Sequence, residues 1–84
     1  MPVFTISKHA REQMSLRGIS EEIVIHVLEN PQQILSESNK KIYQSIINFT
    51  DRKYLVRVIV NTEKESFNII TVYRTSKIEK YYEG

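Results

Sequence analysis

Cysteine is absent from this chain of 84 residues, and glycine and histidine occur only twice each. Without cysteine the chain can form neither a disulfide framework nor a thiolate metal site. Two glycines are too few for most glycine-rich loops that cradle nucleotide phosphates. Two histidines without clustered carboxylates also disfavour a metal centre, so we expect neither a metal nor a cofactor. Stability must come from packing the apolar residues, which make up 40% of the chain.

Long apolar runs are also absent. No segment approaches the roughly 18 apolar residues that a membrane span requires. The first residues, MPVFTI, lack the basic start and the apolar stretch of a secretory signal. We therefore expect a soluble, cytoplasmic protein without membrane contact. The length is near the lower limit for a chain that folds without staples, so we expect a single domain over residues 1–84.

The charge of the chain is almost balanced, with twelve Lys and Arg against ten Asp and Glu and a net charge of +2. Binding of a polyanion must therefore depend on where the cations lie and not on their sum. Basic residues gather near the end of the chain, where Lys77 and Lys80 follow Arg74. The composition by itself gives only mild support to a nucleic acid as partner.

Two helices are predicted in the first part of the chain, because apolar residues recur there at helical spacing. Ser7 is a favourable N-cap for a helix over residues 8–17, and Gly18 provides its stop. Ser20 can cap a second helix with an acidic first turn, which Asn30 and the following proline end. The two segments are typical of a helical hairpin.

After Pro31 the spacing of apolar residues changes from 3.6 to 2, and β-branched and aromatic residues dominate. Strands are predicted over residues 42–49, 54–60 and 67–73, with a possible short edge strand over 33–37. A short helix is predicted over residues 77–82. The fold class is therefore α+β, with an N-terminal helical hairpin packed on a sheet of three to four antiparallel strands and a short C-terminal helix.

The turn between the first two long strands predicts a register that pairs Ile47 with Val56, and the next loop pairs Val58 with Ile69. In this register one sheet face collects nearly all the aromatic residues and valines, including Tyr73. We expect the helices to cover that face.

The opposite face receives three cations in the same register, namely Lys53, Arg57 and Arg74. Arg57 is the most informative of them, because an arginine in the middle of a strand must pair with an acid or await an anion. No residue assigned to its face is acidic. The alternative is that these cations extend to solvent or that a loop acid pairs with Arg57.

Other residues of the chain could take part in proton transfer or in stacking. His9 lies at the edge of the apolar stripe of the first helix, on the side of Arg17, and a neutral imidazole can accept a proton from a ribose 2′-hydroxyl. The alternative, a half-buried histidine bonded to backbone, is the more common case. Tyr81 and Tyr82 can stack on bases or donate to phosphate, or pack the last helix onto the sheet.

Two segments carry a resemblance to known toxins. The opening motif includes His9-Ala10, Met14 and Arg17-Gly18-Ile19-Ser20-Glu21-Glu22-Ile23, continuing through Val27-Leu28 and Asn30-Pro31. It resembles the opening of an uncharacterised family in the RelE-like toxin group. The tail from Ile69 to Lys77, with Glu79 and Tyr81-Tyr82-Glu83, is similar to the end of BrnT-type toxins of the same group.

The resemblance implies a helical hairpin on a curved antiparallel sheet, metal-independent RNA cleavage and a cognate antitoxin that covers the active face. Arg74 matches an arginine at the end of the final strand of the BrnT-like pattern, and Lys77 and Lys80 match basic positions of its terminal helix. Tyr73 stands where that pattern usually has a second arginine. His9 and Arg17 match the opening motif of the other family.

From the residues and the resemblance together we expect the toxin of a type II toxin–antitoxin pair, acting as an RNA endonuclease. Its partners would be an antitoxin and RNA, either free RNA or ribosome-bound mRNA. The alternatives are a non-catalytic protein-binding module and a homodimer that buries the apolar part of the basic face. The candidate site residues are His9, Arg57, Arg74 and Tyr81 for catalysis, and Arg17, Lys53, Lys77 and Lys80 for binding RNA.

Overall fold

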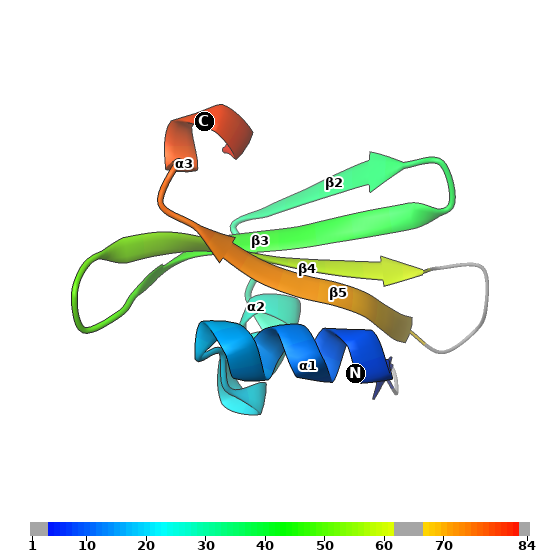
Figure 1. The fold of residues 1–84 in the computed structure, drawn as a ribbon. Coiled ribbons are helices and arrows are strands. Elements are labelled where there is room, and N and C mark those ends of the chain that lie inside the picture. Colours follow the sequence, from blue (N-terminus) through cyan, green and yellow to red (C-terminus); the bar gives the residue numbers. More distant parts are fainter. Residues whose placement is uncertain (1–3, 62–66, 83–84) are drawn as a thin grey trace.

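The computed structural model describes residues 4–61 and 67–82, which form one mixed sheet and three helices (Figure 1). In chain order the elements are β1 (Phe4–Ile6), α1 (Lys8–Arg17), α2 (Glu21–Glu29), β2 (Gln33–Glu37), β3 (Lys40–Asn48), β4 (Lys53–Asn61), β5 (Phe67–Thr75) and α3 (Ile78–Tyr81). The strand order is β1-β5-β4-β3-β2. Figure 1 shows α1 and α2 below the sheet and α3 above it. The α+β class is confirmed.

The helix boundaries follow from the capping residues that the sequence indicates. Ser7 Oγ accepts a hydrogen bond from the backbone N–H of Ala10 at 3.1 Å, and Ser20 Oγ accepts one from that of Ile23 at 3.2 Å. Gly18 ends α1 in the left-handed region with φ at 62°. The predicted span of the first helix is confirmed, as is the end of the second before Pro31.

The sheet is larger than predicted and is not purely antiparallel. β1 pairs with β5 in parallel, which makes a fifth strand and a mixed sheet. The prediction of three to four antiparallel strands is wrong on this point. β1 has only three residues and runs directly into the cap of α1, so it is too short to display an alternating pattern. The strand over residues 33–37 is confirmed as β2.

The main core fills the space between α1, α2 and the lower sheet face. It is built from aliphatic residues of all three elements, together with one methionine and one tyrosine, and most of them have no solvent exposure. Its buried members are Ala10, Met14, Ile19, Val24, Val27, Tyr43, Val56, Val58, Val60, Ile69 and Val72. On β3 and β4 this is the face for which the alternating pattern predicts helix cover.

The register between β3 and β4 differs from the prediction by two residues. Val56 pairs with Ser45 and not with Ile47, which pairs with Tyr54. Because side chains alternate between faces with a period of two, this shift leaves every side chain on its predicted face. The composition of the two faces is therefore right on β3 and β4 even though the pairs are wrong.

Between β4 and β5 the register changes part-way along the ladder. Val60 pairs with Ile69, but the preceding residue, Ile59, pairs with Thr71. Ile70 is the extra residue, and the shift is a β-bulge in β5. One inserted residue reverses the alternation, so the two halves of β5 present opposite sets of side chains to the helices.

The bulge corrects the predicted faces of β5. Val58 pairs with Val72 and not with Ile69, and both Ile69 and Val72 belong to the core below the sheet. Beyond the bulge Arg74 therefore lies on the helix-covered face, while Tyr73 lies on the upper face. The predicted register places Tyr73 on the helix-covered face and Arg74 on the upper face, which is wrong for both residues.

Among the described residues, no helix combines the length and the apolar character needed to cross a membrane.

Candidate functional site

Arg57 is a buried charge at the centre of the sheet. It lies in the middle of β4 on the upper face, between Leu55 and Ile59, while Val56 and Val58 point into the core below. Its exposed fraction is 8%. In the part of the chain that the structure describes, no acidic side chain forms an ion pair with it. Since burying an unpaired charge costs several kcal/mol, Arg57 needs other partners.

Those partners are neutral groups on three surrounding elements. Arg57 Nε donates a hydrogen bond to Gln44 Oε1 on β3 at 2.9 Å, and an Nη1–H donates to the Tyr73 hydroxyl on β5. The guanidinium carbon lies 5.6 Å from the ring centre of Tyr73 and 4.5 Å from that of Tyr81 on α3. Dipoles and ring faces stabilise a cation without cancelling its charge. Within residues 4–61 and 67–82, nothing therefore cancels the positive charge of Arg57.

Gln44 joins the strands to the terminal helix. Its side chain has no solvent exposure. Besides accepting from Arg57, it donates from Nε2 to Gln33 Oε1 on β2 at 2.7 Å and to the backbone carbonyl of Tyr81 at 3.2 Å. The amide oxygen and both amide N–H groups of Gln44 thus have partners inside the cluster. We call Gln33, Gln44, Arg57, Tyr73 and Tyr81 the arginine cluster.

The terminal segment lies over this cluster and brings two more cations. α3 has only four residues, and none of them is buried. The ammonium of Lys80 lies 5.4 Å from the Tyr81 ring, and Lys77 is exposed at the start of the helix. A depression of about 480 Å³ is lined by Ser76, Lys77, Ile78, Glu79 and Lys80. The predicted residues Arg57, Lys77, Lys80 and Tyr81 therefore occupy one side of the molecule.

His9 and Arg17 lie on the other side. Both belong to α1, which packs below the sheet, whereas Arg57 faces α3 above it (Figure 1). His9 is exposed and not half-buried, and Arg17 donates from Nη1 to Gln13 Oε1 within the same helix. The sheet separates these residues from the arginine cluster, so the structure does not bring a histidine to Arg57.

Arg74 is separated from Arg57 as well. Its guanidinium carbon lies 4.4 Å from the ring centre of Phe49 and 4.3 Å from that of Tyr54, on the helix-covered face. Lys53 shares the upper face but starts β4, four residues from Arg57 and so roughly 13 Å along the strand. The prediction that these three cations lie together is wrong, because the bulge turns Arg74 to the opposite face.

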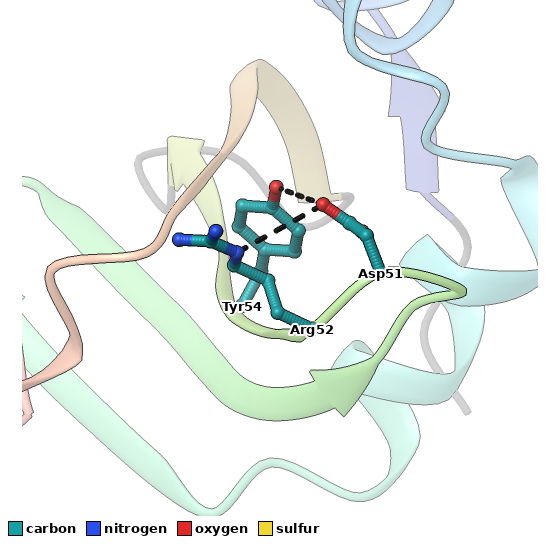
Figure 2. Close-up of polar contacts among 3 residues, drawn as sticks. All are labelled: Asp51, Arg52 and Tyr54. Carbon is teal, nitrogen blue, oxygen red and sulfur yellow. Dashed lines mark hydrogen bonds and ion pairs between the residues drawn. The ribbon is translucent and has the colours of Figure 1, made fainter.

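The rings that hold Arg74 are anchored at the β3–β4 hairpin. Figure 2 shows the Tyr54 hydroxyl donating to Asp51 Oδ2, at 2.9 Å, and Arg52 Nε at 3.9 Å from the same oxygen. The hydrogen bond from Tyr54 is the main cause that lowers the pKa of Asp51 below its usual 3.8. Asp51 thus holds the Tyr54 ring on which Arg74 stacks, so the role of Arg74 and Asp51 is structural.

Three members of the arginine cluster, Gln33, Gln44 and Tyr73, are missing from the candidates that the sequence suggests. Gln44 stands between Ile42 and Ile46 on one face of a strand, and a polar residue in such a place needs a partner. The sequence alone therefore indicates that Gln44 has a polar partner. Tyr73 was assigned to the core face because the bulge in β5 has no mark in the sequence pattern.

No group of three or more His, Asp or Glu side chains that could hold a metal ion occurs among residues 4–61 and 67–82. A family model described as Domain of unknown function (DUF4258) matches residues 6–74, which is most of the chain. No curated protein and no solved structure matches it.

Proposed function

We propose that the chain, which belongs to the DUF4258 family, is the toxin component of a type II toxin–antitoxin pair and cleaves RNA at the arginine cluster without a metal. The observation that carries the proposal is Arg57, a buried guanidinium that has no ionic partner among the described residues. Such a cation is suited to bind one phosphate group of a polyanion. Lys77 and Lys80 add attraction for the neighbouring phosphates.

In the proposed reaction the ribose 2′-oxygen attacks the adjacent phosphorus and the bond to the 5′-oxygen breaks. A proton leaves the 2′-hydroxyl and another reaches the 5′-oxygen, so the products are a cyclic 2′,3′-phosphate and a 5′-hydroxyl. Arg57 stabilises the negative charge that grows on the phosphoryl oxygens in the transition state. The Tyr73 hydroxyl, which accepts a hydrogen bond from Arg57, is the group that we propose for proton transfer at the cluster.

The substrate must displace the ring of Tyr81 to reach Arg57, because this ring covers the guanidinium at 4.5 Å. A helix of four residues without a side-chain cap is marginal by itself, so the helix opposes this movement little. The cost of the movement lies in the contacts of Tyr81 with Arg57 and Gln44. Tyr81 can then stack on a base beside the bound phosphate. His9, Arg17 and Arg74 have no part in this chemistry.

The proposed partners are RNA, including ribosome-bound mRNA, and an antitoxin that covers the upper face in the cytoplasm. Support comes from the resemblance of the opening motif to the RelE-like group and of the tail to BrnT-type toxins. The two helices followed by antiparallel strands agree with what that resemblance implies. Tyr73, which replaces an arginine of the BrnT-like pattern, supplies a hydroxyl at the cluster where a second cation is expected.

The test is cleavage of a labelled RNA oligonucleotide in the presence of EDTA, beside the same oligonucleotide with 2′-deoxyriboses. We expect cleavage of the ribose substrate only. Arg57→Ala should abolish it, while Arg52→Ala, which removes an exposed arginine of the hairpin turn, should leave it unchanged. His9→Ala should also be active. Undiminished cleavage by Arg57→Ala would refute the assignment of the site.

A second candidate function is a non-catalytic module that binds a partner protein. The observation in its favour is β2, which pairs only with β3 in the described sheet and carries Ile34 with 49% exposure. An open edge strand can accept a strand from another chain. Toxicity in cells without any change in RNA would favour this function, and a monomeric mass in solution would exclude the homodimeric form.

A further inference from the structure

We infer that Gln44 is a positioning residue, which orients the guanidinium of Arg57 and leaves its charge free for a phosphate-bearing anion. The inference rests on the proposed function, since it concerns the same site. It explains why position 44 is a glutamine and not a glutamate: the site needs an amide there, and a carboxylate of the same shape would prevent anion binding.

The orientation of the Gln44 amide is set from both ends. Its oxygen accepts from Arg57 Nε at 2.9 Å, and its nitrogen donates to the carbonyl oxygen of Tyr81 at 3.2 Å and to Gln33 Oε1 at 2.7 Å. A flipped amide would place two donors together at Arg57 and two acceptors together at Tyr81. Only one orientation satisfies the cluster, and Arg57 is held in one plane as a result.

The charge of the group at position 44 decides what Arg57 can bind. Glutamate has nearly the shape of glutamine, so it would form a buried ion pair with Arg57 and cancel the charge that attracts phosphate. Its second oxygen would also face the carbonyl oxygen of Tyr81, which cannot donate. Glutamine avoids both effects, because it accepts from the cation without neutralising it.

The chain contains a matched control for this substitution. Gln13 accepts a hydrogen bond from Arg17 on α1, so the same side-chain chemistry occurs on the other side of the sheet. Gln13→Glu and Gln44→Glu change the net charge equally. A difference between them reports on the position of the new carboxylate and not on the charge of the whole molecule.

The experiment measures the binding of two probes. Binding of inorganic phosphate is followed by NMR at the Arg57 Nε–H resonance. Binding of a 2′-O-methyl RNA oligonucleotide, which cannot be cleaved, is followed by fluorescence anisotropy. We expect Gln44→Glu to weaken both by roughly tenfold to a hundredfold, the size of losing one charge-assisted contact. Gln13→Glu should stay within about twofold, because Gln13 lies on α1, across the sheet from Arg57. Equal effects of the two variants, or unchanged binding by Gln44→Glu, would overturn the inference.

Gln44→Met separates positioning from charge. It keeps the charge of Arg57 but removes the acceptor that orients it, so we expect oligonucleotide binding to persist and kcat for cleavage to fall by roughly tenfold, while KM changes little. This variant also decides the question if circular dichroism shows that Gln44→Glu is unfolded. Wild-type kcat in Gln44→Met would then overturn the inference.

The outcomes distinguish this inference from the proposed function. If phosphate binds at Arg57 and Gln44→Glu abolishes that binding, yet no RNA is cut, the proposed function is wrong and the inference stands. If folded Gln44→Glu cuts RNA at the wild-type rate, the inference is wrong and the function stands. A wild-type protein that binds neither probe overturns the inference.

Discussion

The hydrogen bond between Arg57 and Gln44 should be one of the strongest side-chain couplings in the molecule, and a double-mutant cycle can measure it. The two residues are 8% and 0% exposed, and their bond is 2.9 Å long. Methionine has about the length of glutamine and replaces the aliphatic part of arginine, so either substitution removes the polar group and keeps an unbranched apolar side chain. The cycle therefore consists of Arg57→Met, Gln44→Met and the double variant.

The magnitude follows from what each single variant leaves behind. Gln44→Met leaves a buried Arg57 Nε–H without its acceptor, and Arg57→Met leaves the buried Gln44 oxygen without its donor. Each loss should cost about 1–3 kcal/mol of the free energy of unfolding. The double variant removes both groups, so its cost should be smaller than the sum by about 1.5–3 kcal/mol, the range for a hydrogen bond to a charged group.

Urea denaturation of the four proteins at neutral pH gives the coupling energy. The pair of Arg11 and Glu21 provides the comparison, because their charges are 3.8 Å apart but their side chains are 60% and 56% exposed. Its cycle should yield only about 0.2–1 kcal/mol. Strictly additive effects of the Arg57 and Gln44 substitutions, or a coupling no larger than that of the surface pair, would refute the reasoning.

Three further predictions concern the parts of the fold that surround the site. Arg74→Ala should lower the free energy of unfolding by about 1–2 kcal/mol, since it removes the cation that stacks on Phe49 and Tyr54. It should leave RNA cleavage unchanged. A loss of cleavage in a folded variant would contradict the structural role of Arg74. Asp51→Asn should be less stable than wild type at neutral pH. Because folding lowers the pKa of Asp51, the stabilisation by its carboxylate is present above the unfolded value of 3.8 and is lost as the pH falls through the folded value. The urea denaturation curves of the two proteins should therefore converge in acid. A stability difference that stays constant down to the lowest pH would contradict this. Gly18→Ala should cost about 1 kcal/mol by strain at positive φ and not by a clash, because a Cβ there would meet nothing within 4 Å, and thermal unfolding without any loss would argue against the left-handed cap.

The helices could be predicted from the sequence because their ends are determined locally. Ser7, Gly18 and Ser20 each perform their capping role within three or four residues of chain, and the structure confirms all three. The faces of β3 and β4 were also predictable, because the alternation of apolar residues is unbroken there and a register shift of two residues does not disturb it.

The arrangement of the cations could not be predicted, because it depends on the bulge at Ile70. A bulge is decided by how two strands fit against each other and against the helices, and no glycine or other local signal marks this one. The single extra residue exchanges Tyr73 and Arg74 between the faces. A predicted group of three cations thereby becomes one arginine surrounded by tyrosine and glutamine, while Arg74 joins an aromatic pair on the other side.

Locating bound RNA on the protein decides between the two faces of the sheet. In a titration with the 2′-O-methyl oligonucleotide, followed by NMR, we expect the largest changes at the side-chain signals of Gln44 and Arg57 and at the amides of β5 beyond the bulge and of α3. Changes confined to α1, around His9 and Arg17, would contradict the assignment of the arginine cluster as the site where RNA is bound and cut.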